Sequence, residues 1–467
     1  MSRGSPHRLP FGTRLAFAAT SLPLAALGLA ITVHLPAYFA ASIGVPLMVV
    51  AGAFATVRAI DIPIEPLLGV SMDRTRSRLG RYRLWTLIGA PLLMGGLFML
   101  FTAREGVGLP YLIGWLLVMY LGVSILTLAH AAWGATLAKS YDERSRIFGL
   151  MAAVGVLGAI SVLAIPIVME QLGYSDAQGI QAMGWFLIGL TPVAVAVVTI
   201  FTPETIAPEP PGQRFRVRDY LELVTRPSFA RILAADICLS LGPGWMASLY
   251  LFFSRDWLGF SAGQANILLG VYVLAGLAGA PTLAWLATRI GKHRAVMAAT
   301  TVYSLTLVTL AFLPNGNLLA ALPTLFVTGF MAAGFTVLTR AMTADVADEV
   351  RLEQGKERSG LLYALTTLTT KVALAGSIVL TFFVLDQVGY DPKLAGGNTA
   401  DAITGLMLAF IVGPVIFVMA GGACLIGYGL TAERAAETCA RLDARDALYD
   451  EHPAVDKLTD AGAVVPR

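Results

Sequence analysis

The chain has 467 residues, of which 56% are hydrophobic and only 13% are charged. Because a typical soluble domain is about 25% charged, this composition excludes an ordinary soluble enzyme or nucleic-acid-binding protein, and it equally excludes a disordered chain. The formal net charge of +3 gives no sign of an acidic partner. The cysteines are too few and too scattered for a disulfide framework or a metal site; they are Cys238, Cys424 and Cys439.

Long apolar segments recur along the whole chain. A membrane-spanning helix requires about 20 mainly apolar residues, and the sequence contains twelve such segments. They are 15–40, 46–71, 84–103, 110–138, 147–170, 180–201, 229–253, 264–288, 295–313, 318–345, 360–386 and 403–429. Outer-membrane strands would instead alternate apolar and polar residues over about 10 positions. The sequence therefore predicts an all-α polytopic membrane protein.

The Lys and Arg residues lie mainly on one side of these segments. Of the 33, 27 fall in the termini and in the loops that follow even-numbered spans. The other loops contain only Arg104, Arg255 and Lys393. Because cytoplasmic loops are enriched in Lys and Arg, we expect a protein of the cytoplasmic (inner) membrane with both termini in the cytoplasm.

The longest polar connection, 202–228, separates six spans from six. A short motif repeats across it: Arg78-Leu79-Gly80-Arg81 follows the second span and Arg289-Ile290-Gly291-Lys292 follows the eighth. This repeat predicts two six-helix bundles in the same orientation, 1–201 and 229–429, followed by a cytoplasmic tail, 430–467. In such duplicated folds the solute site lies between the halves, near the middle of the membrane.

The second span contains three ionisable residues, Arg58, Asp61 and Glu65. At 100° per residue all three share one helix face. A charge inside a membrane costs at least about 2.5 kcal/mol, so a partner or a function is expected. Pro63 and Pro66 free backbone carbonyl oxygens that can join the carboxylates around a small cation. We interpret this face as a Na⁺ or H⁺ site; the alternative is a structural Arg58–Asp61 ion pair.

Lys371 lies about a dozen residues into the eleventh span, directly after a run rich in threonine. Its ammonium needs an anionic partner, and Asp61 or Glu65 of the other half would serve. Such an ion pair would bridge the two halves and rearrange when they move. The alternative is a lysine that extends to the membrane surface.

Asp236 in the seventh span is either a site residue or the partner of a loop cation.

Charges of both signs gather where two spans reach the cytoplasm. Near the second span these are Asp73, Arg74, Arg78 and Arg81, and near the tenth they are Arg340, Asp345 and Asp348. This mixture favours a cytoplasmic gate over plain solvated charges. The arginines also suit anionic lipid head groups.

Candidate solute-binding residues lie in the fourth and first spans. Thr127, His130 and Trp133 are neighbours on one helix surface. A tryptophan ring packs well against a sugar, and a histidine can donate or accept a hydrogen bond. Ordinary packing, with the histidine bonded to a backbone carbonyl, is an equal alternative. Tyr38, four residues after His34, is a further candidate, although packing is the more typical role.

Catalytic and nucleotide-binding motifs are absent from the sequence. There is no GxxxxGK[ST] loop and no HExxH, CxxC or GxSxG motif. We therefore expect neither an enzyme nor a cofactor. The energy would come from an ion gradient, which supplies about 2.3 kcal/mol per charge at 100 mV.

The segment from Arg58 to Gly69, followed by the basic loop from Asp73 to Trp85, resembles the signature of the glycoside–pentoside–hexuronide:cation symporters, a branch of the major facilitator superfamily. Trp133-Gly134, Arg340-Ala-Met-Thr-Ala-Asp345 and Lys371 extend the resemblance over most of the chain. The resemblance implies a twelve-span major facilitator fold and cation-coupled symport of a small organic solute.

The resemblance also implies roles for individual residues. It places the coupling Na⁺, Li⁺ or H⁺ on Asp61 and Glu65, with Arg58 and Lys371 as charge partners. Trp133 matches the sugar-stacking tryptophan of the family. We expect a monomer that contacts membrane lipids, a solute and a coupling cation, but no nucleic acid.

The departures from the family pattern concern the solute. Ala25 and Ala129 stand where the melibiose permease of this family has sugar-binding acids, Met151 stands where a basic residue is common, and Glu65 replaces a usual Asp. These changes favour a less polar solute. A lipid or amphiphile transporter or exporter of the same fold is therefore an alternative, and a membrane enzyme or sensor is a more distant one.

Overall fold

The computed structural model describes residues 9–75, 77–137, 141–204, 223–354, 359–394 and 397–451. These residues are helical, with no strand among them. Within this part of the chain, twelve helical segments are long and apolar enough to cross a membrane, as predicted. The expected connection 202–228 lies mostly outside the described residues, as does the end of the expected tail.

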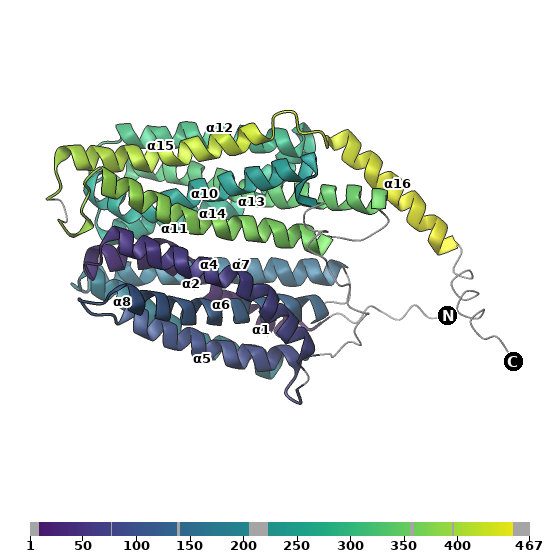
Figure 1. The fold of residues 1–467 in the computed structure, drawn as a ribbon, viewed down its shortest axis with the longest axis horizontal. Helices are drawn as coiled ribbons and strands as arrows, with labels where there is room; N and C mark the ends of the chain where they lie inside the picture. Colours follow the sequence, from purple (N-terminus) through teal and green to yellow (C-terminus); the bar gives the residue numbers. More distant parts are fainter. Residues whose placement is uncertain are drawn as a thin grey trace.

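The first six spans form one layer of the molecule (Figure 1). The first span is a series of short segments: α1 (Phe11–Ala18), α2 (Ser21–Leu29), the π-helical turn η1 (Ala30–His34), α3 (Leu35–Ala37) and a second π-helical turn, η2 (Tyr38–Ser42). Pro36 lies between the two π turns, where its missing N–H interrupts the helical hydrogen bonds. The continuous helices are α4 (Leu47–Arg74), α5 (Arg81–Phe101), α6 (Leu109–Leu137), α7 (Tyr141–Gln171) and α8 (Asp176–Phe201).

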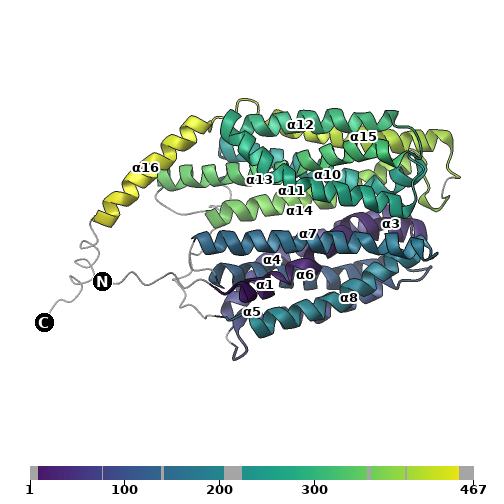
Figure 2. The ribbon, with the colours of Figure 1, turned by 180° about the vertical axis from the view of Figure 1, so that it is seen from behind.

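The second six spans form the other layer, seen from behind in Figure 2. They are α10 (Pro227–Asp256), α11 (Ala262–Ile290), α12 (Lys292–Thr309) extended by the 3₁₀ turn η3 (Leu310–Phe312), α13 (Leu318–Gln354), α14 (Ser359–Gln387) and α15 (Ala400–Cys424). A short turn, η4 (Pro392–Leu394), precedes α15, and α16 (Ala432–Glu451) follows it. The helix α13 extends well beyond residue 345, the end expected for the tenth span, so Asp345 and Asp348 lie on a continuous helix.

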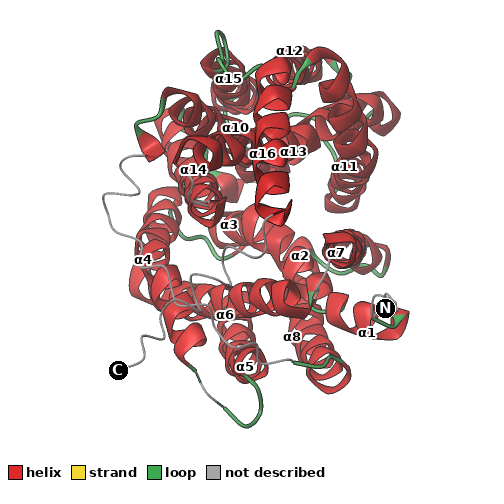
Figure 3. Ribbon diagram, turned by 90° about the vertical axis from the view of Figure 1, so that its right-hand side faces the viewer, coloured by secondary structure: helices red, strands yellow, loops and turns green. Residues whose placement is uncertain are grey.

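Two helix pairs join the layers. In the end view of Figure 3, α4 lies beside α14 and α7 lies beside α11. We call the end of the molecule where Phe11 and α16 lie the terminal end, and the other the opposite end (Figure 1). Side chains on the facing sides of these four helices can therefore contact the other half.

The sequence repeat corresponds to a repeated backbone turn. Gly80 and Gly291 have φ angles of 103° and 91°, and each directly precedes a helix, α5 and α12 respectively. Positive φ is the reason for glycine at this point, since other residues are strained there. The two halves thus begin their third spans with the same turn.

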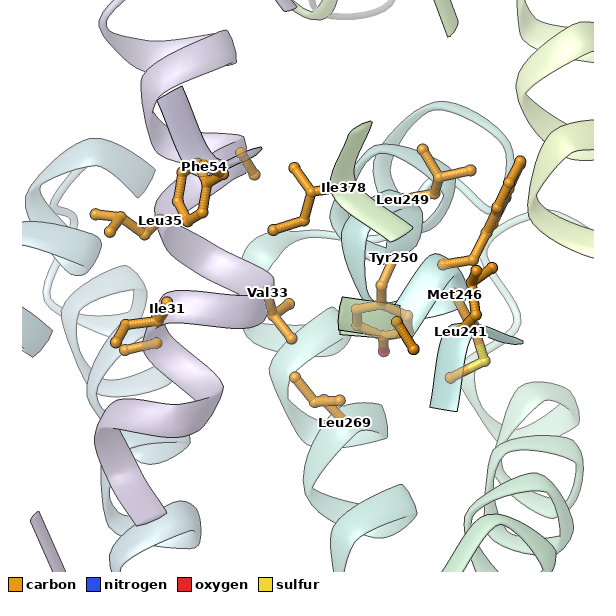
Figure 4. Close-up of a cluster of buried hydrophobic side chains, with 14 of the residues drawn as sticks. Ile31, Val33, Leu35, Phe54, Leu241, Met246, Leu249, Tyr250, Leu269 and Ile378 are labelled. Carbon is orange, nitrogen blue, oxygen red and sulfur yellow. The ribbon is translucent and has the colours of Figure 1, made fainter. Parts of the chain in front are cut away.

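The interface towards the opposite end contains a large apolar cluster. Figure 4 shows side chains from both halves in one buried cluster, including Val33 of η1, Phe54 of α4, Tyr250 of α10 and Ile378 of α14. Tyr250 satisfies its hydroxyl by donating to the carbonyl of Ala265 at 2.7 Å. This packing removes apolar surface from solvent and holds the layers together.

Candidate functional site

Asp61 lies near the middle of α4 and is only 2% exposed. Its Oδ2 atom is 3.3 Å from Nη1 of Arg58, one helical turn away. The guanidinium carbon of Arg58 lies 4.1 Å from the centre of the Tyr120 ring on α6. A cation over an aromatic face is stabilised by the ring quadrupole. Arg58 is therefore held by two partners, one anionic and one aromatic.

Lys371 of α14 reaches the same place from the other half. Its Nζ is 3.6 Å from Asp61 Oδ2 and donates a hydrogen bond to Glu65 Oε1. Lys371 and Glu65 are 20% and 21% exposed, so solvent reaches part of the pair. The structure thus brings together the four charged residues singled out in the sequence, with the ammonium shared between two carboxylates.

Ser124 of α6 completes the cluster and escaped the sequence analysis. Its hydroxyl lies 2.9 Å from Asp61 Oδ1 and 3.2 Å from Glu65 Oε1. Ser124 carries one hydroxyl hydrogen within reach of both acids, so it can donate to either of them. The signal in the sequence that could have identified Ser124 was its position three residues before the candidate Thr127, on the same helix face.

The cluster has the chemistry of a cation site. Carboxylate and hydroxyl oxygens are the ligands that hard cations prefer, and a carboxylate also accepts a proton. The Lys371 ammonium already provides a positive charge to both acids. A coupling cation at the same oxygens would therefore compete with Lys371. The cation-binding roles of Asp61 and Glu65 stay predictions.

His130 and Trp133 lie in a packed cluster within the first half. His130 is 4% exposed and its Nε2 lies 2.9 Å from the Phe17 carbonyl oxygen. Trp133 is 1% exposed and its Nε1 donates to the Pro203 carbonyl at 3.2 Å. Both polar atoms thus have backbone partners, and neither residue lines the two cavities described below. Their solute-binding roles stay predictions that require another arrangement of these side chains.

Thr127 and Tyr38 have contrasting surroundings. Thr127 is exposed and lies one turn from Ser124 on α6, beside the charged cluster. Tyr38 is buried near the opposite end, where its hydroxyl accepts a hydrogen bond from Gln181 Nε2 at 3.2 Å. Thr127 is thus near the charged residues, whereas Tyr38 packs within the first half.

The positions that depart from the family pattern are also packed. Ala129 is fully buried on α6, beside Met72 and Ile125. Ala25 lies against Gly155 of α7, and Met151 packs on the cluster around Trp133. No acid or base occupies these three places.

The predicted gate in the first half is only partly visible. The side chains of Asp73 and Arg74 lie outside what the structure describes, and Arg78 is exposed. Glu204, which the sequence analysis missed, accepts hydrogen bonds from the backbone N–H groups of Arg81 and Tyr82, at 2.7 and 2.8 Å. This carboxylate caps the first turn of α5, where negative charge is favourable.

In the second half, Asp345 of the predicted gate forms a salt bridge with a neighbouring helix. Lys292 Nζ lies 2.6 Å from Asp345 Oδ1 and 2.7 Å from Oδ2. It joins the start of α12 to α13, within one half. Arg340 is exposed, and Asp348 is half-buried. The gating roles of these residues stay predictions.

The described residues line two cavities of about 390 Å³ each, one almost wholly within the second half and one between the halves. The first, the Asp236 cavity, is lined by α10, α11, α13 and α14, together with Thr32 of η1. The second lies towards the opposite end and is lined by residues that include His34, Glu170 and Asn266. In the Asp236 cavity, the side-chain hydroxyls of Thr369 and Thr370 donate to Asp236 Oδ2.

Comparison with known proteins gives consistent results. Residues 16–432 match the family described as MFS/sugar transport protein. The isoprimeverose transporter of Lactiplantibacillus pentosus is 23% identical over 419 residues, which cover 86% of this chain and 83% of that protein. The putative glycoside/cation symporter YagG of Escherichia coli is 25% identical over 426 residues, which cover 86% and 88%.

Among solved structures, the nucleoside transporter NupG is similar with a TM-score of 0.66 at 12% identity, covering 90% of this chain and 100% of that one. A bacterial homologue of the lysosomal transporter Spinster, crystallised inward-facing and unoccupied, has a TM-score of 0.60 at 13% identity, covering 94% and 99%. At these identities the likeness concerns the fold alone.

Proposed function

This chain belongs to the MFS/sugar transport protein family, and from that premise we propose how it works as a multi-pass secondary transporter. It carries a small organic solute together with a cation, Na⁺ or H⁺, which binds at Asp61 and Glu65. We place it in the cytoplasmic membrane as a monomer surrounded by lipid, with the terminal end in the cytoplasm. The charge asymmetry of the loops supports this orientation.

The single observation that carries the proposal is the position of Lys371. Its ammonium contacts the Asp61 and Glu65 carboxylates across the boundary between the halves. A cation that takes these oxygens releases Lys371, because three positive charges at two carboxylates repel one another. Binding of the cation therefore changes the contact between α4 and α14. A ligand shifts an equilibrium by its differential affinity for the two states, and this contact differs between them.

The rest of the interface supports alternating access. Near the opposite end, Glu170 of α7 accepts a hydrogen bond from the backbone N–H of Gly263 at the start of α11. The Lys393 side chain lies against Gly44, between η4 and the end of η2. Together with the apolar cluster of Figure 4, these contacts hold the halves together at the opposite end. The arrangement supports a state that is closed towards the outside.

The solute class comes from the relatives, whose names indicate glycosides and isoprimeverose. We propose a glycoside or a sugar of similar size. An amphiphilic solute is the second candidate, because the Asp236 cavity is lined largely by apolar and small side chains. A screen of thermal stabilisation by sugars and amphiphiles, each with and without Na⁺, separates the two.

The test of cation coupling is Asp61→Asn in reconstituted vesicles. We expect solute counterflow to persist, since it needs no net cation movement, whereas gradient-driven accumulation is lost. Glu105→Gln, an exposed acid near the opposite end, is the matched control and should transport normally. Unchanged accumulation in Asp61→Asn would refute the assignment.

A further inference from the structure

Asp236 is a buried acid that the proposed cation site does not use. It lies on α10, is 6% exposed and lines a cavity of about 390 Å³. Its Oδ2 atom accepts hydrogen bonds from Thr369 Oγ1 at 2.7 Å and from Thr370 Oγ1 at 3.0 Å, both on α14. A buried carboxylate needs such donors, because burial without them is costly. The seventh-span acid thus takes hydroxyl partners from α14.

The lining of the cavity around Asp236 combines polar and apolar side chains. Asp236, Ser240 and Thr370 lie among residues such as Gly244, Phe335 and Leu374. Its volume falls within the range of about 300–1,000 Å³ that small-molecule sites occupy. A ligand that matches this lining carries both hydroxyl donors and apolar surface. A sugar ring, which has both hydroxyl groups and C–H faces, meets this description.

The acceptor capacity of Asp236 is not exhausted by the two threonines. A carboxylate has about four lone-pair positions; Thr369 and Thr370 use two of them, and Thr339 is a further side-chain hydrogen-bond partner. The remaining capacity suits one hydroxyl group of a solute. Hydrogen bonds to a charged acceptor are stronger than those between neutral groups. An acid here would therefore discriminate strongly between solutes that do and do not present hydroxyl groups.

Two adjacent residues of α14 connect the cavity with the proposed cation site. Thr370 donates to Asp236, while the next residue, Lys371, contacts Asp61 and Glu65. Thr32 of the first half also lines the cavity, so the two halves meet there. A displacement of α14 that releases Lys371 from the acids therefore also changes the donors at Asp236.

We propose that Asp236 is the carboxylate that binds a hydroxyl group of the transported glycoside, with Thr370 positioning it. This inference rests on the proposed symport and names where its solute binds. The position is consistent with Ala25 and Ala129, which leave the first half without acids at two places where a family member has them. The polar contact to the solute is then made from the second half, by α10 and α14, and α14 also carries Lys371, which contacts Asp61 and Glu65.

The test compares Asp236→Asn with wild-type protein in proteoliposomes, with isoprimeverose as the probe and an imposed cation gradient. We expect the half-saturating isoprimeverose concentration to rise at least about 10-fold, as for the loss of a hydrogen bond to a charged group. Thermal stabilisation by the coupling cation alone should stay at its wild-type value. Among monodeoxy derivatives of isoprimeverose, at least one should bind about 10-fold more weakly than the parent to wild type but not to Asp236→Asn.

A second pair of variants covers the case in which Asp236→Asn does not fold. Thr370→Val removes one donor to Asp236 and should raise the half-saturating concentration about 3-fold. Thr366→Val on the same helix is the matched control, because its hydroxyl donates to the Tyr363 carbonyl instead. The Thr366→Val protein should resemble wild type in solute affinity.

The outcomes separate the two proposals. If wild-type protein shows no cation-dependent uptake of, and no stabilisation by, isoprimeverose or any other sugar of the screen, the glycoside function and this inference both fail. If wild type transports the sugar and Asp236→Asn has the same affinity and the same discrimination among deoxy sugars, only the inference fails. Loss of stabilisation by the cation alone in Asp236→Asn would assign the residue to the cation site and also overturn the inference.

Discussion

Single residues at the middle of α4 and α14 form a charged contact between the halves. Asp61 and Glu65 of one half share the ammonium of Lys371 of the other. Removing one partner of a buried ion pair leaves an uncompensated charge and typically costs about 3–5 kcal/mol. The same sensitivity makes the pair a suitable switch, because an external cation can replace the lost partner.

We expect Lys371→Ala to lower the melting temperature of the purified protein, because Glu65 loses its cationic partner and Asp61 keeps only Arg58. Added Na⁺, or lower pH if H⁺ is the coupling ion, should restore stability more strongly than in wild type, since a ligand that binds the folded state stabilises it. Thermal unfolding in detergent measures this. Arg104→Ala, an exposed basic residue near the opposite end, is the control. Equal cation responses in wild type and Lys371→Ala would contradict the competition between Lys371 and the cation.

Ser124→Ala removes the hydroxyl that lies between the two acids. Hydrogen bonds to charged groups contribute about 1.5–3 kcal/mol, so we expect the half-saturating concentration of the coupling cation to rise about 10-fold. Maximal solute uptake at saturating cation should be unchanged. The control is Ser161→Ala, whose hydroxyl donates only to the Leu157 carbonyl among its described bonds. An unaltered cation dependence would place Ser124 outside the site.

At the scale of the element, the repeated turn before α5 and α12 has a physical basis that differs between the halves. Both Gly80 and Gly291 need positive φ. At Gly80 a Cβ atom would also lie 2.1 Å from Glu204 Oε2, which caps α5, whereas at Gly291 the nearest atom would be 3.6 Å away. The first turn is therefore constrained by backbone conformation and by contact, and the second by conformation alone.

We expect Gly80→Ala to destabilise the protein by about 1–3 kcal/mol from the positive-φ backbone conformation alone, with a further loss from the displaced cap. Gly291→Ala should cost less. Gly95→Ala is the control on the same helix, since a Cβ there meets nothing within 4 Å and alanine is favoured in helices. Thermal unfolding of the three variants gives the ranking. Gly80→Ala and Gly291→Ala of equal stability would show that Glu204 contributes nothing.

At the scale of the whole molecule, the two helix pairs between the layers have different contacts. The α4–α14 pair contains the charged cluster, whereas the α7–α11 pair is joined near the opposite end by Glu170 and Gly263. Opening at the opposite end requires that the second contact break. We therefore expect the cation to weaken the α4–α14 contact, while the Glu170–Gly263 hydrogen bond, which we call the latch, separately limits opening at the opposite end.

Glu170→Gln should weaken the latch and populate the state open at the opposite end. The reporter is a cysteine at Ala265, which is 3% exposed and lines the second cavity. We expect its labelling by a membrane-impermeant maleimide, added from outside, to accelerate about 10-fold when a charged acceptor is lost. Glu105→Gln serves as the control. Equal labelling rates would show that this hydrogen bond does not limit opening.

The sequence by itself determined the number of spans, the two-fold repeat, the expected orientation and the positions of Arg58, Asp61, Glu65 and Lys371. These features depend on local apolar runs, on loop charge and on ionisable groups inside spans, all of which are visible along one chain. Only the tertiary structure decided that Ser124 joins the acids, that Glu204 caps α5, that His130 and Trp133 are packed, and that Asp236 faces a cavity. Each of these depends on which helices are neighbours, and hydrophobic periodicity places a residue on a helix face without stating what that face meets.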